Sequence, residues 1–460
     1  YEGIFVNYGI ILAGGKGSRM HSKTAKCAVP ILGKPMINYT LEAIQKTNIN
    51  QIICVLGNHH NQFHLPDGIG SVIQEKPLGT ADAVKTALQS ISNDEGDTLI
   101  IPGDVPFLET KTINEMMTLH RENKNVLTIG TIRVSLPKGY GRVVREKNRI
   151  IRIVEEKDAS EEEKKIQEVY CGVMCIRTRI LKEYISLIQN DNAQHEFYLT
   201  DLVELISNKF NVGSYEIEDV FQAQGINDLP TLIRLEKEYQ VRIINKHIQA
   251  GVRFENIDSV TIGPNVEFVG EVFVRVGSVI TGKSVLYSGV TVGPNTEIVD
   301  SIIYEDVVVA HSVIEQSIIH KNSTIGPFAH IRNDSNIGEN NRIGNFVEIK
   351  NTTTGLKTYA SHLAYIGDTE CGSGVNFGCG IVTVNYDGVN KHKTKIGSNV
   401  FIGCNSNLIA PIEIASNSYI AAGSTITKDL AVGDFAIARA KQITKSEYAN
   451  KFHYKRVDEE

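Results

Sequence analysis

Short apolar runs alternate with amphipathic patterns over the first half of the chain, up to about residue 229. The runs with β-strand composition are YGIILAG, QIICVLG, TLIIPGD, NVLTIGTI and VYCGVMCI. Between them, INYTLEAIQKT, ADAVKTALQSI and TINEMMTLHREN carry apolar residues at helical spacing. This alternation predicts βαβ units in a Rossmann-like α/β domain with a mostly parallel sheet. Ligands of such sheets bind beyond the carboxyl ends of the strands, where the Gly-rich segments fall.

Residues 230–250 change the pattern and predict one long helix between two domains. Pro230 suits the first turn of a helix and Gly251 its end. Leu232, Leu235 and Tyr239 keep helical spacing between them. We therefore expect a first domain at 1–229, a linker helix at 230–250 and a second domain at 251–460.

From about residue 252, aliphatic residues recur at every sixth position. A first series runs through Ile262, Phe268, Val274, Ile280, Leu286, Val292 and Ile298, with a small or β-branched residue four positions after each, up to Ile302. The period returns in a shifted phase from Ile325 to Ile349, and again from Ile396 to Ile426. A hexad sustained this long is typical of a parallel β-helix, whose stacked coils supply the core. An ordinary β-sandwich would have longer strands and irregular spacing.

Two breaks in the hexad phase draw attention, at 349–366 and at 383–396. Both segments contain residues that the repeat does not need, including His362 and the run NYDGVNKHK. Loops that leave a rigid scaffold often carry function. We expect binding or catalysis at these two breaks.

Charge and cysteine content narrow the class of protein. The formal charge of -6 disfavours nucleic-acid binding, which needs a basic surface. No apolar run approaches the roughly 18 residues that span a bilayer, so no membrane insertion is expected. The first residues, YEGIFVNYGIILAGG, predict a strand rather than a signal peptide. The seven cysteines lack a CxxC pair, which favours a reducing cytoplasm and mostly buried thiols, with Cys379 and Cys404 as the two candidates for reactivity.

The segment LAGGKGSRM follows the first strand and predicts a phosphate-binding loop. Consecutive glycines let backbone N–H groups approach a phosphate, and Lys16, Arg19 and Lys26 add positive charge. Asp104 ends the strand of IIPGD, where a carboxylate could bind Mg²⁺. The alternative for Asp104 is a capping or turn aspartate. A second turn, QEKPLGTADA, could contact a base or sugar.

The second domain contains polar stretches that a β-helix does not require, namely HIRND, FVEIK, ASHLAYIGD and GVNFGCGIVTVNYDGVNKHK. Acyl transfer from a thioester to an amine needs a base for the ammonium proton. His362 is the candidate, because the ordinary pKa of histidine is near 6.5. The alternative is a surface or core histidine, of which the chain has many; the position at a phase break beside Tyr365 favours the catalytic role.

The glycine loop and the following lysine resemble the sugar-nucleotide pyrophosphorylase family. Together with the β-helix they resemble, over essentially the whole chain, the bifunctional N-acetylglucosamine-1-phosphate uridyltransferase/glucosamine-1-phosphate N-acetyltransferase family of bacterial envelope synthesis. The resemblance implies Arg19 and Lys26 at the phosphates of UTP, and Mg²⁺ held by Asp104 and Asn227. It further implies substrate contacts by Leu12, Ala13, Gly14, Gly15, Gln74, Gly79, Thr80, Gly103, Gly141, Glu155 and Tyr170.

For the second domain, the resemblance implies a left-handed parallel β-helix that forms a homotrimer. His362 would be the base, oriented or polarised by Glu348. The glucosamine-1-phosphate contacts would be Arg332, Lys350, Tyr365, Asn376 and Lys391. Acetyl-CoA would contact Cys379, Asn385, Tyr386, Cys404, Ala422 and Arg439. N-acetylglucosamine-1-phosphate made there would then receive uridylyl in the first domain.

Three positions depart from the family pattern. Gly14 replaces an alanine, which removes a methyl near the nucleotide, and Ala25 replaces a proline, which predicts a looser approach to Lys26. Tyr170 replaces an asparagine that binds the sugar. Tyrosine either reaches the sugar differently or points away, so we expect altered sugar-phosphate selectivity.

Two other functions compete with the bifunctional enzyme. One is a single-activity sugar-nucleotide pyrophosphorylase with a structural, oligomerising β-helix, which would not need His362 and NYDGVNK. The other is a non-catalytic binding protein, which would not need the glycine loop, Lys26, Asp104 and Asn227 together.

Overall fold

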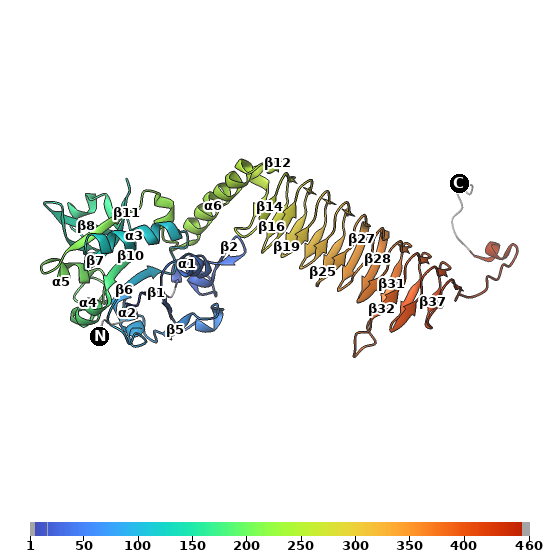
Figure 1. The fold of residues 1–460 in the computed structure, drawn as a ribbon, viewed down its shortest axis with the longest axis horizontal. Helices are drawn as coiled ribbons and strands as arrows, with labels where there is room; N and C mark the ends of the chain where they lie inside the picture. Colours follow the sequence, from blue (N-terminus) through green and yellow to red (C-terminus); the bar gives the residue numbers. More distant parts are fainter. Residues whose placement is uncertain (1–4, 16, 453–460) are drawn as a thin grey trace. The chain divides into compact units, whose positions relative to one another are not determined.

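A computed structural model describes residues 5–15 and 17–452 of the chain (Figure 1). The expected role of Lys16 lies outside the described residues. The chain forms two compact units, which divide between Tyr239 and Gln240.

A seven-strand path of one mixed sheet forms the centre of the first unit. Its order is β11 (Val212–Glu216), β7 (Leu127–Arg133), β10 (Glu168–Arg177), β6 (Asp97–Pro102), β1 (Tyr8–Ala13), β4 (Gln51–Leu56) and β5 (Gly70–Ile73). β1 pairs in parallel with β4 and β6, as expected. However, β10 is antiparallel to β6 and β7. The expectation of a mostly parallel sheet was therefore too simple.

The antiparallel part follows from a hairpin that the strand-helix alternation did not reveal. β8 (Gly141–Glu146) and β9 (Arg149–Val154) pair with each other, and β8 pairs with β10. Antiparallel neighbours need only a turn between them, whereas parallel strands need a longer crossover. A small ribbon of β2 (Pro30–Ile31) and β3 (Lys34–Pro35) lies outside this sheet.

Helices cover both faces of the sheet. α1 (Met36–Gln45) and α3 (Thr110–Glu122) contribute to one core cluster, whereas α2 (Thr80–Leu88), α4 (Thr178–Tyr184) and α5 (Asp201–Ser207) contribute to the other. Adjacent residues of β1 belong to opposite clusters: Ile10 to the second and Ile11 to the first. Both are fully buried, as expected for a central strand whose side chains alternate between two covered faces.

A third core cluster anchors the start of the long helix α6 (Leu229–Gln249). Leu232 and Leu235 of α6 are buried there, and the Tyr239 ring packs 4.6 Å from the Phe107 ring. The division between the two units falls inside this helix. Residues of α6 therefore belong to both units.

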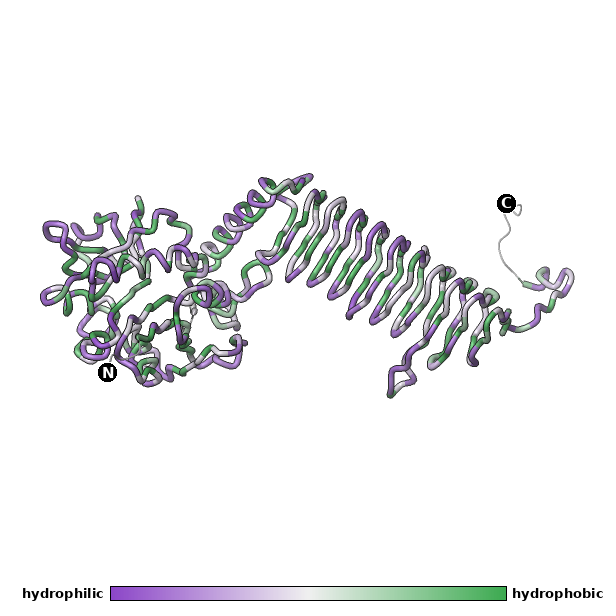
Figure 2. Tube along the Cα trace, in the orientation of Figure 1, coloured by the Kyte–Doolittle hydropathy of each residue, from purple (hydrophilic) through white to green (hydrophobic). Residues whose placement is uncertain are grey.

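The second unit is a stack of coils made from very short parallel strands (Figure 2). The longest ladder joins β12 (Arg253–Phe254), β13 (Thr261–Ile262), β15 (Phe273–Val274), β16 (Val279–Thr281), β18 (Thr291–Val292), β19 (Glu297–Val299), β21 (Val308–Val309), β22 (Val313–Glu315), β24 (Thr324–Ile325), β25 (His330–Arg332), β27 (Arg342–Lys350), β28 (Tyr359–Gly367), β30 (Asn376–Phe377), β31 (Ile381–Val384), β33 (Phe401–Ile402), β34 (Asn407–Ile409), β36 (Tyr419–Ile420), β37 (Thr425–Ile426) and β38 (Phe435–Ala436). A second ladder joins β14 (Glu267–Val269), β17 (Val285–Tyr287), β20 (Ile302–Ile303), β23 (Ile318–Ile319) and β26 (Asn336–Ile337). A third joins β29 (Thr369–Cys371), β32 (Thr394–Ile396) and β35 (Ile412–Ile414).

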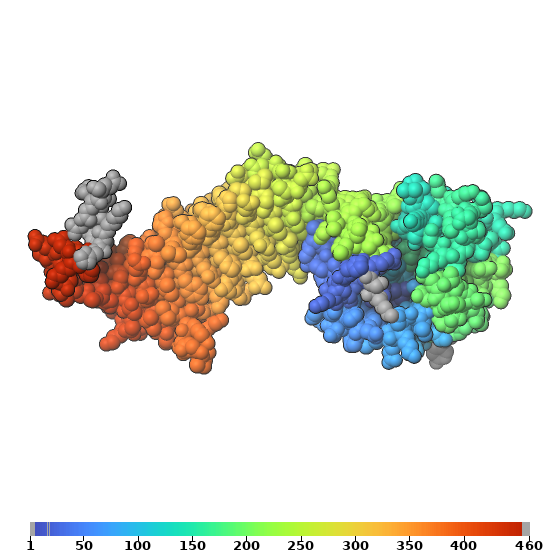
Figure 3. Space-filling model, turned by 180° about the vertical axis from the view of Figure 1, so that it is seen from behind, coloured from blue at the N-terminus to red at the C-terminus, as the bar shows by residue number. Residues whose placement is uncertain are grey.

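This stack is the parallel β-helix expected from the hexads, with the left hand that the resemblance implied. Regular coils repeat after 18 residues, as in the pairing of Glu267 with Val285, which is three hexads. The hexad residues of the series point inward, and most, such as Ile280 and Ile343, are fully buried. Figure 3 shows the coils packed into a continuous surface. Across the described residues, the structure has no helix with the length and apolar stretch that crossing a membrane would take.

Two expectations about the repeat need correction. Ser301, not Ile302, is the buried small residue that follows Ile298, because the coils shorten here and Ile302 pairs with Ile318. At 349–366 no loop leaves the stack, since Ile349 pairs directly with Ile366 and this coil is one residue short. The phase break therefore marks one residue missing from a regular coil, not an inserted loop. His362 lies within strand β28.

The break at 383–396 is a true insertion. Val382 pairs with Asn407, 25 residues further on, so this coil has seven residues more than a regular one. The extra residues form a largely hydrophilic loop between β31 and β32, which projects from the stack (Figure 2).

Candidate active sites

The first unit contains a cavity of about 810 Å³ beyond the carboxyl ends of β1 and β6. Most of the residues expected at the nucleotide and the sugar phosphate line it, namely Leu12, Gly14, Gly15, Arg19, Lys26, Gln74, Gly79, Thr80, Asp104, Gly141, Glu155, Tyr170 and Asn227. Ala13 and Gly103 lie behind the wall, where the Gly103 N–H donates to the Leu12 carbonyl at 2.8 Å. A Cβ at Gly103 would come within 3.2 Å of Ala13, so these residues shape the loop from behind.

Four polar side chains from three distant segments converge on one point of this cavity. Lys26 Nζ donates to Asn227 Oδ1 at 2.7 Å and also contacts Asp104 Oδ2. Arg19 Nη2 lies 3.4 Å from the same Asn227 oxygen. Asp104 follows β6, and Asn227 precedes α6, so only the folded chain brings them together.

This cluster has the donor atoms that a hard divalent cation requires. Among the described residues, no group of three or more His, Cys, Asp or Glu side chains is placed to hold a metal. However, the Asp104 carboxylate and the Asn227 amide oxygen both contact the Lys26 ammonium. These two oxygens therefore stabilise a positive charge at the point between them. Mg²⁺ commonly takes one or two protein oxygens and completes its shell with phosphates and water. The residues present therefore fit such an ion.

Gln74 closes another part of the cavity and is held in a fixed orientation. Its Nε2 donates to Asp82 Oδ2 at 2.7 Å and to the Gly79 carbonyl at 3.2 Å. Gly79 has a φ of 128° and a Cβ there would lie 2.4 Å from the Phe197 carbonyl, so only glycine fits. This arrangement leaves the Gln74 carbonyl as an acceptor near the glycine loop. Asp82, which positions Gln74, was not expected from the sequence.

A buried carboxylate marks the opposite wall. Glu155 Oε1 accepts from Thr200 Oγ1 at 3.0 Å, and burial raises the pKa of Glu155. Tyr170 pairs in register with Gly141 on β8, and both line the cavity beside Glu155. Within the described part of the chain, the buried hydroxyl of Tyr170 has no hydrogen-bond partner. Thr200 was missed because a lone threonine between two segments carries no motif.

The departure at Ala25 has a local compensation. Its backbone N–H, which a proline would lack, donates to Gln62 Oε1 at 2.6 Å. Gln62 Nε2 also donates to the Lys23 carbonyl at 3.2 Å. Gln62 therefore tethers the segment that leads to Lys26, where we had expected a looser approach. At Gly14, a Cβ would lie 3.1 Å from Gln74 Oε1, so the missing methyl leaves space beside that oxygen.

In the second unit, the candidate base lies at a corner of the coil. Phe328, Phe346, Leu363, Gly380, Asn405 and Gly423 all have positive φ and mark this corner in successive coils. In the last five of these coils, the residue directly before the positive-φ residue lies at the same corner. These five residues are Asn345, His362, Cys379, Cys404 and Ala422, and we name them the corner column. Asn345 pairs in register with His362, and their side chains approach at 3.0 Å between Oδ1 and Nδ1.

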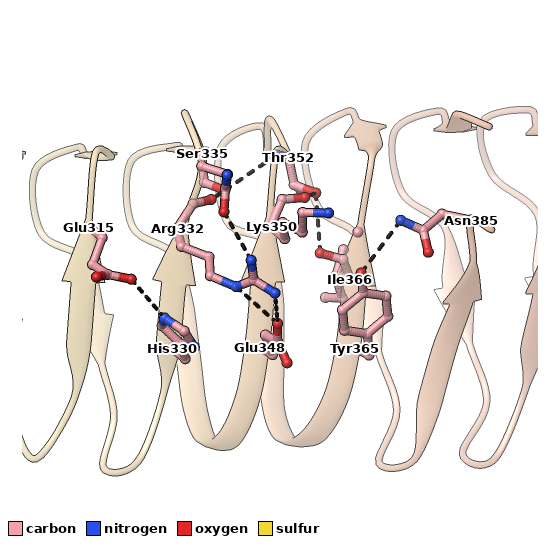
Figure 4. A network of polar contacts seen from close by, with 12 residues as sticks. Glu315, His330, Arg332, Ser335, Glu348, Lys350, Thr352, Tyr365, Ile366 and Asn385 are labelled. Carbon is pink, nitrogen blue, oxygen red and sulfur yellow. Dashed lines mark hydrogen bonds and ion pairs between the residues drawn. The ribbon is translucent and has the colours of Figure 1, made fainter. Parts of the chain in front are cut away.

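The expected pairing of Glu348 with His362 is not the one that the chain makes. Glu348 Oε1 accepts from Arg332 Nη2 at 2.6 Å and from Nε at 3.1 Å (Figure 4). Glu348 pairs in register with Tyr365, three residues beyond His362 and past the corner. Within one chain, Asn345 therefore orients the imidazole. The expectation failed because the sequence did not show which residue of the preceding coil stacks on His362.

Positive charge gathers beside Tyr365. Arg332 and Lys350 pair in register on adjacent coils. The Lys350 ammonium lowers the pKa of Lys391, which reaches it from the inserted loop. Two neighbouring ammonium groups, with Arg332 on the next coil, form a suitable site for a phosphate dianion.

Asn385 joins this group rather than the corner column (Figure 4). Its Nδ2 lies 3.4 Å from Tyr365 Oη and contacts Asp368 Oδ2. A Cβ at Gly367 would lie 2.6 Å from Tyr365 Oη, so this glycine makes room for the ring. Tyr386 is exposed, and its hydroxyl donates to the Gly388 carbonyl within the loop.

The remaining acetyl-CoA candidates are contiguous with His362. Cys379, Cys404 and Ala422 are successive members of the corner column, and Arg439 Nη1 donates to the Ala422 carbonyl at 2.8 Å. Asn376 pairs with Tyr359 and Phe401, before the corner. Asn376 and Tyr365, which are both expected at the sugar, thus lie on different sides of the corner. A single chain therefore does not enclose these two residues or the candidate base His362.

Comparisons with known proteins cover both units. A family model described as "Nucleotidyl transferase" matches residues 8–221, and "Bacterial transferase hexapeptide (six repeats)" matches 316–351 and 393–428. The "Bifunctional protein GlmU" of Acholeplasma laidlawii is 48% identical over 446 residues, which are 96% of this chain and 97% of that protein. That of Clostridium novyi is 41% identical over 94% of this chain and 96% of that protein. A solved UDP-glucose pyrophosphorylase in complex with UDP-glucose matches 52% of this chain and 100% of its own, with 17% identity and a TM-score of 0.45.

Proposed function

We propose that this chain, which belongs to the family of bifunctional GlmU proteins, carries both transferase activities of UDP-N-acetylglucosamine synthesis. In this proposal, residues 251–460 acetylate glucosamine-1-phosphate with acetyl-CoA. Residues 1–229 then transfer uridylyl from UTP to N-acetylglucosamine-1-phosphate and release pyrophosphate. Residues 230–250 link the two parts.

The observation that carries the first activity is the convergence of Lys26, Asp104 and Asn227 in the cavity. A phosphate oxygen of the sugar phosphate attacks the α-phosphorus of UTP, and pyrophosphate leaves. The backbone of Gly14 and Gly15 approaches the triphosphate, while Arg19 and Lys26 neutralise charge that develops in the transition state. Glu155 and Thr200 form the amino-sugar end of the same cavity.

We propose Mg²⁺ as the metal, held by Asp104 and Asn227. When bound, it would neutralise phosphate charge and orient the two reactants. Lys26 contacts the same two oxygens, so it would move toward a phosphate as the ion enters. The chain's own contribution is to hold both oxygens at a single point.

The second activity is supported by the corner column beside the basic group. With the proton on Nδ1 shared with Asn345, Nε2 of His362 offers the lone pair that a base needs. His362 takes a proton as the amine attacks the thioester carbonyl, and the thiolate of CoA leaves and is protonated. Arg332, Lys350 and Lys391 bind the sugar phosphate, with Asn376 and Tyr365 at the sugar.

The open geometry supports self-association of the chain. The candidates lie on the outer surface of a solenoid, on both sides of a corner, so a neighbouring chain would be needed to enclose the substrates. We propose a homotrimer and a cytoplasmic location, without nucleic-acid or membrane partners. The single-activity alternative leaves the tethered Asn345–His362 pair and the paired ammonium groups unexplained.

The two activities can be tested separately. The purified chain is given glucosamine-1-phosphate, acetyl-CoA, UTP and Mg²⁺, and free CoA and pyrophosphate are followed independently. We expect both products, with pyrophosphate dependent on Mg²⁺. Pyrophosphate release from supplied N-acetylglucosamine-1-phosphate, without any CoA release, would establish the single-activity alternative.

A further inference from the structure

Cys379 and Cys404 are stacked on adjacent coils of the corner column. The ladder pairs on either side, Phe377 with Ile402 and Val382 with Asn407, both join residues 25 positions apart, as the two cysteines are. The Asn405 N–H donates to the Cys379 carbonyl at 2.7 Å, which fixes the register at the corner itself. The two cysteines therefore face the same way from neighbouring coils.

The other cysteines have no such arrangement. Cys27, Cys54, Cys171, Cys175 and Cys371 are buried, and burial raises the pKa of each thiol. Of the seven, Cys379 is partly exposed and Cys404 is exposed. Reagents in solution can therefore reach these two thiols and not the others.

The spacing of stacked coils suits a covalent link. Neighbouring strands lie about 4.8 Å apart, within the roughly 4.4–6.8 Å that separates the Cα atoms of disulfide-bonded cysteines. Their Cβ atoms must approach to about 3.8 Å, a displacement of about 1 Å at the corner. Both cysteines lie between short strands rather than within one, where the backbone can make that adjustment.

We infer that Cys379 and Cys404 form a dithiol site that a low-molecular-weight disulfide oxidises to an intrachain disulfide, which reversibly blocks acetyl transfer. The inference rests on the proposed acetyltransferase function for its effect on activity, but not for formation of the bond. Neither family model nor the names of the relatives assign a redox role to these residues.

The reaction consists of two balanced thiol–disulfide exchanges. The Cys404 thiolate, as the more exposed, attacks one sulfur of the small disulfide; a mixed disulfide forms and one small thiol leaves. The Cys379 thiolate then attacks the Cys404 sulfur and expels the second small thiol. Two cysteine protons and two electrons pass to the reagent, which ends as two thiols. An excess of dithiothreitol reverses both steps.

The effect on catalysis follows from the position of His362. Cys379 lies between His362 and Cys404 in the corner column, with the register set by Ala364 and Ile381. Drawing Cys379 toward Cys404 moves it away from His362 and alters the surface next to the base. A displacement of about 1 Å near a reacting group can lower a rate by about 10². The cavity of the first unit involves other residues and should not respond.

The test uses the full-length chain and glutathione disulfide. After the incubation, free thiols are blocked with iodoacetamide and the intact mass is compared with that of a reduced, alkylated control. The oxidised chain should lack two alkyl groups and, beyond that difference, should be about 2 Da lighter because two hydrogens are lost. Trypsin should yield peptides 358–391 and 396–428 joined by a disulfide. Acetyl transfer should fall at least about tenfold and return with dithiothreitol, while uridylyl transfer stays within about twofold.

Two single variants serve as matched controls, Cys379→Ser and Cys404→Ser. Each is compared with itself before and after glutathione disulfide, so its starting activity does not matter. Neither should form the linked peptides, and Cys379→Ser should accept one glutathione. Linked peptides in Cys379→Ser would assign the bond to Cys371, and a disulfide between chains would remove the intrachain site; either result overturns the inference.

The two proposals fail in different ways. If the linked peptides form but the reduced chain never releases CoA, the proposed acetyltransferase function is wrong and the dithiol site stands without its regulatory role. If the reduced chain acetylates its substrate and both thiols remain alkylatable after oxidation, the dithiol site is wrong and the function stands. If the disulfide forms and acetyl transfer is unchanged, the switch is wrong.

Discussion

The two candidate sites are built in opposite ways. In the first unit, residues from β1, β6, the β8–β10 region and the start of α6 surround one cavity. In the β-helix, the candidates lie in columns along the outside of stacked coils, on both sides of a corner. A doubly covered sheet gathers distant loops at one edge, whereas each coil of a solenoid contacts only its neighbours. The first site can therefore be complete in one chain, and the second needs another surface.

The largest expected effect concerns this dependence on a neighbour. Residues 252–460 alone should form a trimer that acetylates glucosamine-1-phosphate, because the coils supply their own core. Dilution into monomers should abolish that activity, while uridylyl transfer by the full chain should survive the same dilution. Light scattering with parallel assays checks both. A monomeric fragment that remains fully active would remove the contrast between the two sites.

Replacing His362 with Ala tests the open site directly. Loss of a general base should lower acetyl transfer by about 10²–10⁴, with uridylyl transfer unchanged. Asn345→Ala should give a smaller loss, because Asn345 only orients the imidazole. His320→Ala, which removes an imidazole elsewhere on the stack, is the control. Near-normal acetylation in His362→Ala would show that the base is another group.

Replacing Asp104 with Ala tests the enclosed site. Removing one of the two oxygens that converge on Lys26 should lower uridylyl transfer by about 10³, with acetyl transfer unaffected. The exposed Asp67→Ala is a matched control for loss of one carboxylate. The assay is pyrophosphate release across a Mg²⁺ titration. Turnover that saturates normally with Mg²⁺ in Asp104→Ala would place the metal elsewhere.

Tyr170→Asn tests how closely the enclosed site fits its sugar. The Tyr170 hydroxyl is buried without a partner among the described residues, and a shorter amide could reach the sugar. We expect a gain of about 1–2 kcal/mol in sugar-phosphate binding, the scale of one hydrogen bond. The apparent KM for N-acetylglucosamine-1-phosphate should fall while that for UTP stays constant. A higher sugar-phosphate KM would mean that tyrosine already fits this chain.

The smallest effect is on stability and should appear only in the first unit. Burial, with Glu155, Glu204 and Asp158 nearby, raises the pKa of Asp201 to about 6 from 3.8. A folded-state pKa above the unfolded value penalises the charged form, so stability falls as pH rises from about 4 to 6. After allowance for solvent screening, Asp201→Asn should stabilise this unit by about 1 kcal/mol at pH 7 and by nothing below pH 4.

Urea unfolding at both pH values checks this expectation, with the exposed Asp191→Asn as control. The transition assigned to the β-helix should not move in either variant. Equal stabilisation at pH 7 and below pH 4 would show that the amide acts by packing rather than by charge.

The sequence by itself determined the class of each unit and most residues of the enclosed cavity. Local periodicity specifies strands, helices and hexads, because side-chain spacing within an element directly reflects the face that is buried. A glycine loop after a strand and an aspartate ending another must meet at one sheet edge, which brings Lys26 and Asp104 together. The resemblance added Asn227, Gly141, Glu155 and Tyr170, which no local pattern would have joined to them.

Only the tertiary structure decided which residues stack between coils. Coils of 16 to 25 residues shift the register by amounts that no single hexad reveals, so the partner of His362 is Asn345 and not Glu348. The same stacking places Cys379 on Cys404, although 25 positions separate them. The antiparallel β10 and the contact of Thr200 with Glu155 likewise depend on long-range pairing. Such contacts follow from packing between distant segments, and local sequence carries no signal for them.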